Sequence, residues 1–358
     1  MVEKFRSDII IEGSGLSASA LAYYISLHND DDVIILIQGE TKETDIPNFT
    51  PGFSFPQFDL PVDSMGNIFR KTKDNLRDLH SISGLFEFSI NPLVTTYRGR
   101  NFQKLMENHK EKLGKTNIKH NLLDIEDISN YYPFISRQEE IYLLEIFDSI
   151  TCANINELSH AFQKFAEENN VIITKESGNL RLDVKSCQLL SEESSYTANK
   201  NITITSKQLF SSSFHEEFFA LDISTPVFEK FPRINLIDFN NKSCMWLEEA
   251  GYFHIFRLFD VDDEERNRKQ VEKDFEKIFP HLGILEIADS SFVKLMQCNN
   301  LSKSLGTLSS TNIHYFSLPV ESELSLITIL AENYSYLIAA DRLKENGEFN
   351  FLNLATKD

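Results

Sequence analysis

The chain has 358 residues, 41% of them apolar, which is enough to bury the core of one large domain or two ordinary ones. Its 54 acidic and 35 basic residues give a net charge of −19, which argues against binding to nucleic acid or to an anionic membrane surface. The four cysteines form no CxxC pair and the nine histidines show no ligand spacing, so we expect no metal site.

The sequence shows neither a signal peptide nor a run of about 18 apolar residues. We therefore expect a cytoplasmic protein without an integral membrane segment, and we expect its cysteines to be buried free thiols. Glycine is scarce at 13 residues, although an enzyme that wraps its backbone around a cofactor usually needs more.

The first recognisable unit is a strand, a glycine turn, a helix and a second strand. The strand Ser7–Glu12 contains three consecutive isoleucines, as a strand buried on both faces does. Gly13-Ser14-Gly15 turns the chain, and an amphipathic helical pattern begins at Leu16. The apolar run Val33–Ile37 follows as a second buried strand. The sequence therefore predicts a βαβ unit.

The turn has the form Gly13-x-Gly15-x-x-Ala18, which is typical of dinucleotide-binding units. The first glycine permits the tight turn, the second lets backbone approach a pyrophosphate, and the small third residue lets the helix pack closely. The phosphates would lie at the helix N-terminus, whose N–H groups and dipole favour anions. The predicted cofactor contacts in this turn are Gly13, Ser14, Gly15, Leu16, Ser17 and Ala18.

Two features next to the turn argue against a bound dinucleotide. The acid that usually ends the second strand and binds the ribose is missing, and Ile37 or Gln38 takes that place as a cofactor contact. Glu12 comes directly before the turn and could oppose a pyrophosphate unless its side chain points away. The simpler expectation for Glu12 is a solvated side chain.

The rest of the sequence predicts a mixed α/β protein without repeats. Helical patterns recur at Met65–Ser83, Phe102–Lys112, Ile155–Asn169 and Glu264–Phe279, with strand-like runs between them. Asn154 or Asn156 is a plausible cap of the third of these helices. More than a hundred residues separate the opening unit from that helix, too many for a simple crossover, so we expect them to build part of a second domain.

The order of these segments resembles the FAD-dependent D-amino acid oxidase, glycine oxidase and sarcosine oxidase superfamily. The resemblance is strongest in "DIIIEGSGLSASALAYYIS" at the start and continues in "LLDIEDISNYYPFI" (122–135) and in residues 148–177. It is weaker in "ITSKQLFSSS" (204–213), "GYFHIFRLFD" (251–260) and "ERNRKQVEKDFEKIFPHL" (265–282). The likeness is patchy but ordered over most of the chain.

The resemblance implies a Rossmann-like FAD-binding domain of the glutathione-reductase type, interleaved with a second domain built on an antiparallel sheet. Residues 1–80, 146–220 and 296–358 would form the FAD-binding domain, and residues 81–145 and 221–295 the substrate or cap domain. It also implies FAD as cofactor and an oxidoreductase that oxidises a small-molecule amine or amino acid by hydride transfer to the flavin.

The resemblance also suggests individual residues. Ser211 stands where the family has a glycine beside the flavin, and it is predicted to contact the cofactor. In "GYFHIFRLF", Tyr252 and His254 alternate onto one strand face as candidate substrate contacts, and Arg257 on the other face could bind a substrate carboxylate. The simpler expectation is a packed His254 and an ion-paired Arg257. Lys294 and Cys298 lie where a side chain could approach or bond the flavin, and no catalytic residue is assigned.

Two alternatives remain open at this point. The chain could be a flavin-free descendant of this fold that acts as a binding or structural subunit with a protein partner, because glycine is scarce and residues 313–343 contain none. It could also be a relative of Rab escort proteins or prenylcysteine lyase, whose opening glycine turn is similar. Bound flavin separates the first alternative from an oxidoreductase, and binding of prenylated protein would support the second.

Overall fold

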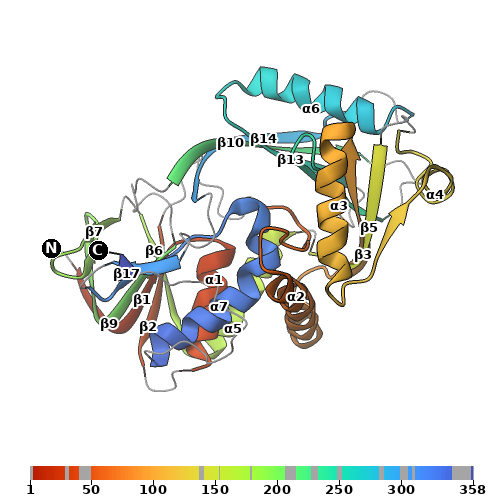
Figure 1. Cartoon of the computed structure of the whole chain (residues 1–358). Helices are drawn as coiled ribbons and strands as arrows, with labels where there is room; N and C mark the ends of the chain where they lie inside the picture. The colour runs from red at the N-terminus through yellow and green to blue at the C-terminus, as the bar shows by residue number, and fades with distance from the viewer. Residues whose placement is uncertain are drawn as a thin grey trace.

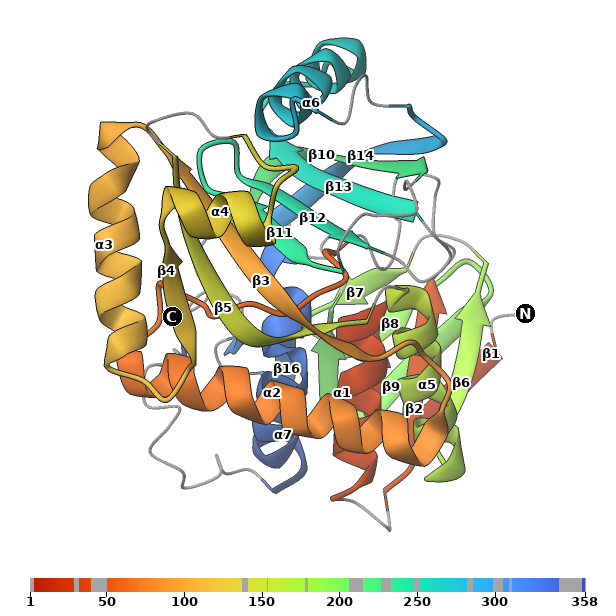
Figure 2. The same ribbon diagram turned by 90° about the vertical axis from the view of Figure 1, so that its right-hand side faces the viewer.

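The computed structural model describes most of the chain. The described residues are 3–28, 32–39, 50–136, 141–152, 154–177, 180–205, 215–226, 233–247, 252–281, 286–298, 305–308, 311–340 and 356–357. They form a mixed α/β fold with two multi-stranded sheets, as predicted, and Figures 1 and 2 show both sheets from two sides.

Sheet A contains the opening unit and has a parallel centre. Its strand order is β17-β15-β16-β9-β1-β2-β6, and the short hairpin β7–β8 is attached to β9. The strands of sheet A are β1 (Glu3–Glu12), β2 (Ile34–Gly39), β6 (Ile172–Glu176), β7 (Arg181–Asp183), β8 (Gln188–Leu190), β9 (Ser194–Ile204), β15 (Leu305–Leu308), β16 (Ile313–Phe316) and β17 (Thr356–Lys357).

Sheet B has the order β14-β10-β13-β12-β11-β3-β5-β4 and is antiparallel except for the β3–β11 pair. Its strands are β3 (Ser89–Arg98), β4 (His120–Leu123), β5 (Ile141–Thr151), β10 (His215–Pro226), β11 (Asn235–Asp238), β12 (Ser243–Leu247), β13 (Tyr252–Phe259) and β14 (Asp289–Cys298).

The helices are α1 (Leu16–Ser26), α2 (Val62–Ser83), α3 (Arg100–Gly114), α4 (Ile125–Tyr131), α5 (Ile155–Glu168), α6 (Glu264–Ile278) and α7 (Glu323–Ala340), with a 3₁₀ turn η2 (Val320–Ser322) before α7. Those that the apolar periodicity predicts are all present within a few residues, whereas α4 and α7 were not predicted by it. Asn154 caps α5 by accepting from the backbone N–H of Asn156 and of Glu157. Among the described residues no helix has the length and apolar character needed to cross a membrane.

The predicted βαβ unit is confirmed. β1 and β2 pair in parallel with Ile9 opposite Ile34, and β9 flanks β1 on its other side. Helices α1, α5 and α7 lie on the same side of sheet A, as Figure 1 shows. Small residues let the helices approach closely, and the Ser19 and Ser159 hydroxyls of α1 and α5 meet at 2.9 Å.

The two sheets take their strands from alternating stretches of the chain, so the predicted interleaving is present in the fold. β5 and β10 extend across residues 146 and 220, where domain boundaries were expected, and the exact boundaries stay a prediction. The polar stretch Ser191–Lys200 belongs mostly to strand β9, which already begins at Ser194. There β9 gains parallel ladder bonds to β1, which outweigh the polar composition.

Residues 50–55 tie the two sheets together. The backbone N–H of Ser54 donates to the carbonyl of Ile150 on β5 at 2.9 Å. One residue later, the N–H of Phe55 donates to Ser325 Oγ on α7, also at 2.9 Å. One extended stretch thus hydrogen-bonds through its backbone both to β5 of sheet B and to α7, which lies on sheet A.

A buried histidine stabilises the packing of α3 on β3. His109 Nδ1 lies 2.7 Å from the Tyr97 hydroxyl, and its ring stacks on Phe58 with centroids 3.8 Å apart. Burial, with a smaller contribution from the charge of Lys112, lowers the pKa of His109 to about 4. The folded protein therefore keeps this ring neutral.

This histidine predicts an acid-sensitive fold. The unfolded chain binds a proton at His109 below about pH 6.5, whereas the folded chain resists it until about pH 4. The free energy of unfolding should therefore fall by about 2 kcal/mol between pH 7 and pH 5 from this group alone. His109→Gln retains polar atoms for Tyr97 but does not titrate. Between pH 7 and pH 5 its free energy of unfolding, measured with urea, should therefore fall less than that of the unmodified protein. Equal losses in both proteins would contradict the assignment.

Candidate functional site

The glycine turn between β1 and α1 has the geometry that its sequence predicts. Gly13 has a φ of 135° and Gly15 a φ of 108°, conformations that side chains with a Cβ rarely adopt. The N–H of Gly13 donates to the carbonyl of Ile37 at 3.0 Å, which closes the turn against β2. Helix α1 then begins at Leu16 without a side-chain cap and without an acidic residue in its first turn. Its N-terminal N–H groups can therefore bind an anion.

A second helix begins next to the same turn. Glu323 is the first residue of α7, and the hydroxyl of Ser17 in α1 donates to its Oε1 at 2.5 Å. Glu323 is 9% exposed, so this carboxylate lies inside the protein against the first turn of α1. Two helix N-termini thus meet around one internal carboxylate, which both helix dipoles stabilise.

Glu12 is not solvated, in contrast to the expectation. It is 4% exposed, because strand β1 lies between β2 and β9 at this point. Alternation along β1 places Glu12 on the face of Ile10, whereas Ile9 and Ile11 pack in the core with α1. Its side chain therefore points away from the helix at whose N-terminus an anion would bind.

The predicted ribose position at the end of β2 offers little polar chemistry. Ile37 is fully buried and packs on Ile10, so only its backbone is available, and its carbonyl already accepts the N–H of Gly13. Gln38 is half-buried and pairs with Lys175 of β6 in the sheet register. Ser211, with Ser212 and Ser213, lies outside the described residues.

The predicted substrate residues lie on β13 in the middle of sheet B. We call inner the face of sheet B whose side chains join the core that includes α1 and α7, and outer the face covered by α6. His254 lies on the inner face, where it stacks on Trp246 of β12 with ring centroids 5.1 Å apart. Its Nδ1 lies 3.5 Å from Asp222 Oδ2 of β10. Tyr252 follows the same alternation at the end of the strand and is 39% exposed.

Arg257 is not brought together with these residues. It lies on the outer face, where its Nη1 is 2.7 Å from Asp274 Oδ2 of α6. The carboxylate that it binds in this structure is therefore internal. Lys294 also points to the outer side and pairs with Glu217 at 2.5 Å, and the side chain of Cys298 lies outside the described ones. Of the other cysteines, Cys152 and Cys244 are buried as expected, whereas Cys187 is only half-buried because it lies in the turn of the short β7–β8 hairpin.

Three residues at the site were not predicted from the sequence: Glu323, Trp246 and Asp222. Glu323 gives no local signal, because an acid in the first turn of a helix is common anywhere. Trp246 and Asp222 join His254 only through the antiparallel register, in which His254 stands opposite Trp246 on one side and Ser224 on the other. The polar face of β13 was the available signal, but its partners depend on strand pairing.

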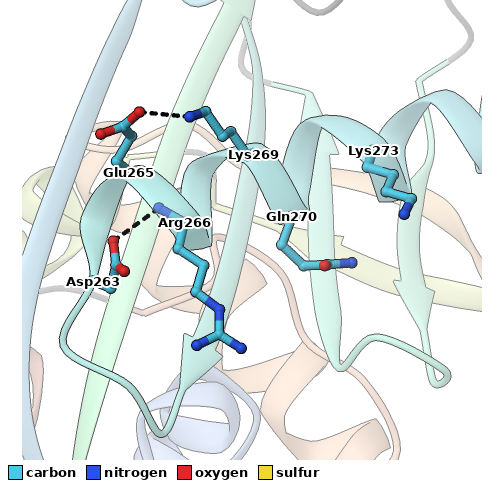
Figure 3. Close-up of a pocket in the computed structure, with 6 residues that line it drawn as sticks. All are labelled: Asp263, Glu265, Arg266, Lys269, Gln270 and Lys273. Atoms are coloured by element: carbon cyan, nitrogen blue, oxygen red, sulfur yellow. Dashed lines mark hydrogen bonds and ion pairs between the residues drawn. The ribbon is translucent and has the colours of Figure 1, made fainter.

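A separate hollow lies on α6, on the opposite side of sheet B from the inner face (Figure 3). It has a volume of about 450 Å³ and is lined by Asp263, Glu265, Arg266, Lys269, Gln270 and Lys273. Lys269 pairs with Glu265 within it, and the side chain of Asp263 caps the helix at Arg266. This mixture of exposed charges is typical of a solvated helix face.

Neither a protein-family profile nor a curated protein sequence matches the chain. Solved structures match it closely in fold. Glycine oxidase from Geobacillus kaustophilus superposes with a TM-score of 0.81 at 10% identity, over 99% of this chain and 100% of that one. L-proline dehydrogenase from P. horikoshii gives 0.79 at 12% identity, over 98% and 96%. L-alpha-glycerophosphate oxidase from Mycoplasma pneumoniae gives 0.74 at 14% identity, over 96% and 97%.

At these identities the likeness concerns the fold, and it extends over nearly the whole length of both partners in each comparison. The resemblance predicted from the sequence is thereby confirmed at that level. The chain has the two-sheet fold of glycine oxidase and proline dehydrogenase.

Proposed function

We propose that this protein is an FAD-dependent oxidoreductase that acts on a small-molecule amine or amino acid. The observation that carries the proposal is the turn at Gly13 and Gly15, which keeps its special backbone conformation and leads into a helix without a side-chain cap. Glycine adopts these positive φ values without strain, and the absence of a Cβ lets a diphosphate approach the backbone closely. The similar glycerophosphate oxidase from Mycoplasma pneumoniae was solved with FAD bound, which supports the choice of cofactor.

The chain's own residues fit such a cofactor at the turn. The backbone N–H groups from Gly15 to Ala18 would hold the diphosphate, and Gln38 would take the place of the missing acid at the ribose. Bound FAD would supply the redox chemistry, because its ring accepts a hydride from a carbon next to nitrogen. His254 and Tyr252 on the inner face of sheet B would orient the substrate and help to exclude water.

A flavin-free binding or structural subunit is the second candidate, and one contact favours it. The carboxylate of Glu323, bonded to Ser17, places a negative charge at the first turn of α1, where the diphosphate would also bring negative charge. A protein partner would then replace the small-molecule substrate as the ligand of this fold.

The absorption spectrum of the freshly purified protein separates the two candidates. An FAD-dependent oxidoreductase should show the visible bands of oxidised flavin, either as purified or after incubation with FAD and gel filtration. A substrate should then bleach those bands under anaerobic conditions. A colourless protein that retains no added FAD would overturn the proposal in favour of the second candidate.

Gly15→Val should abolish FAD retention, because the new side chain blocks the close approach of backbone to the diphosphate. Flavin absorbance per protein after gel filtration measures the effect. Gly114→Ala is the matched control, since a Cβ at Gly114 would meet nothing within 4 Å. Thermal unfolding of both variants checks that the fold persists. Unchanged flavin content in a folded Gly15→Val protein would place the cofactor elsewhere.

Glu323→Gln should raise the affinity for FAD, because the amide oxygen can still accept from Ser17 while the negative charge is removed. Relief of about 1 kcal/mol of repulsion corresponds to roughly fivefold tighter binding. Equilibrium titration of the apoprotein with FAD, followed by flavin fluorescence, measures it. Glu332→Gln on the same helix, roughly 14 Å further along, should leave the affinity unchanged. Weaker binding in Glu323→Gln would show that the carboxylate supports the cofactor instead.

A further inference from the structure

Among the described side chains, the strands of sheet B carry three arginines and lysines, and all three point to the outer face. Alternation places Arg257 on the same face as Phe253 and Ile255, which pack under α6. Lys294 points away from its neighbour Val293, which belongs to the main core, the one that includes α1 and α7. Arg98 likewise alternates with Tyr97 of the main core. Each cation has its own carboxylate partner: Arg98 with Asp238 at 2.6 Å, Arg257 with Asp274 at 2.7 Å and Lys294 with Glu217 at 2.5 Å.

The inner face presents the opposite charge. Asp222 of β10 follows Ala220 of the main core in the strand alternation, and its carboxylate lies beside the imidazole of His254. His254 stacks in turn on Trp246, with an angle of 11° between the two rings. A carboxylate and two aromatic rings therefore lie side by side on the face that points toward sheet A.

Two polar atoms of this group are buried without a hydrogen-bond partner among the described residues: Trp246 Nε1 and Asp222 Oδ1. Trp246 as a whole is only 4% exposed. An unsatisfied buried donor or acceptor costs about 1–3 kcal/mol, and such groups in native proteins usually serve a ligand or an ordered water. The donor and the acceptor lie on the two sides of His254, which contacts both Trp246 and Asp222, and together they outline a small polar site.

The strand that carries Trp246 lies near the start of α7. The ring of Trp246 packs against Phe53 of the segment 50–55, with centroids 6.1 Å apart. Cys244 precedes Trp246 by two residues on the same face, and burial together with the nearby carboxylate of Glu321 raises the pKa of its thiol. A ligand at Asp222 and Trp246 would therefore lie between sheet B and the start of α7.

We propose that Asp222, Trp246 and His254 form a binding site for a cationic amine that carries no carboxylate. Asp222 Oδ1 accepts a hydrogen bond from the ammonium group, and the two aromatic faces add cation–π attraction. Trp246 Nε1 donates to a neutral acceptor on the same ligand. A substrate carboxylate finds no strand cation on the described inner face and is repelled by Asp222. This inference rests on the proposed function, because it selects the amine from the two substrate classes named there.

Ligand binding at this site can be followed by intrinsic fluorescence, since Trp246 is the single tryptophan of the chain. Three probes of equal carbon number test the charge preference: propylamine, propionate and alanine. Each is titrated into the purified full-length protein, after incubation with FAD, while the indole fluorescence is followed. Propylamine should give a saturable change, and alanine and propionate should bind at least about tenfold more weakly.

Asp222→Asn should weaken propylamine binding by at least about tenfold, because the amide no longer pairs with a cation. Asp262→Asn, in the exposed turn before α6, is the matched control and should bind like the unmodified protein. Ser291→Lys is a second variant that keeps Asp222 itself. Ser291 stands opposite Asp222 in the β10–β14 register, so a lysine there should neutralise the carboxylate and displace the amine.

The outcomes separate this inference from the proposed function. Binding of propylamine that both site variants weaken supports the inference, whether or not the protein retains FAD. Tighter binding of alanine or propionate overturns it, and so does propylamine binding that neither site variant changes, even in a protein with full flavin absorbance. The absence of any fluorescence change with all three probes also overturns it. Loss of FAD retention, by contrast, counts only against the oxidoreductase.

Discussion

The site depends on the backbone hydrogen bonds of residues 50–55. This stretch pairs with the end of β5 on one side and with α7 on the other, and Phe53 is completely buried between them. Backbone bonds fix distances more strictly than apolar contacts, which have no directional preference. The inner face of sheet B is therefore held over the starts of α1 and α7. Without this tie, the polar group around Asp222 and the turn at Gly15 would belong to two unconnected surfaces.

The positive electrostatic potential at the N-termini of α1 and α7 determines how well an anion can bind there. α1 and α7 both direct the positive ends of their dipoles to the region of Ser17, and the protein already places one carboxylate there in Glu323. A diphosphate must therefore share this positive potential with an internal competitor. Glu12 lies on the opposite face of sheet A, so its carboxylate does not compete with a diphosphate for this potential. The balance at the site thus depends on one side chain rather than on the net charge of the chain.

The sequence predicted the features that depend on neighbours in the chain. The Gly13–Gly15 turn, most helix positions and a cap at Asn154 or Asn156 follow from conformational preference and periodicity over short windows. The contacts that define the site join distant residues: Ser17 and Glu323 are 306 positions apart, and Asp222 meets His254 through strand pairing. The burial of Glu12 was missed for the same reason, because it results from strands β2 and β9 on both sides. Local pattern fixes which residues share a face, whereas tertiary pairing decides what that face meets.

The segment "HIFR" on β13 shows this difference within four residues. Its alternation puts His254 and Arg257 on opposite faces, as the sequence indicates, but only the packing of α6 decides which face is covered. Asp274 on α6 is almost fully buried, which favours a raised pKa, but hydrogen bonds from Gln270, Lys277 and Arg257 outweigh the burial and keep its pKa low. Turning Arg257 toward a ligand on the inner face would leave that carboxylate with a half-exposed lysine as its one remaining cationic partner among the described residues. The arginine is therefore committed to the outer face, and the carboxylate of Asp222 sets the charge of the inner one.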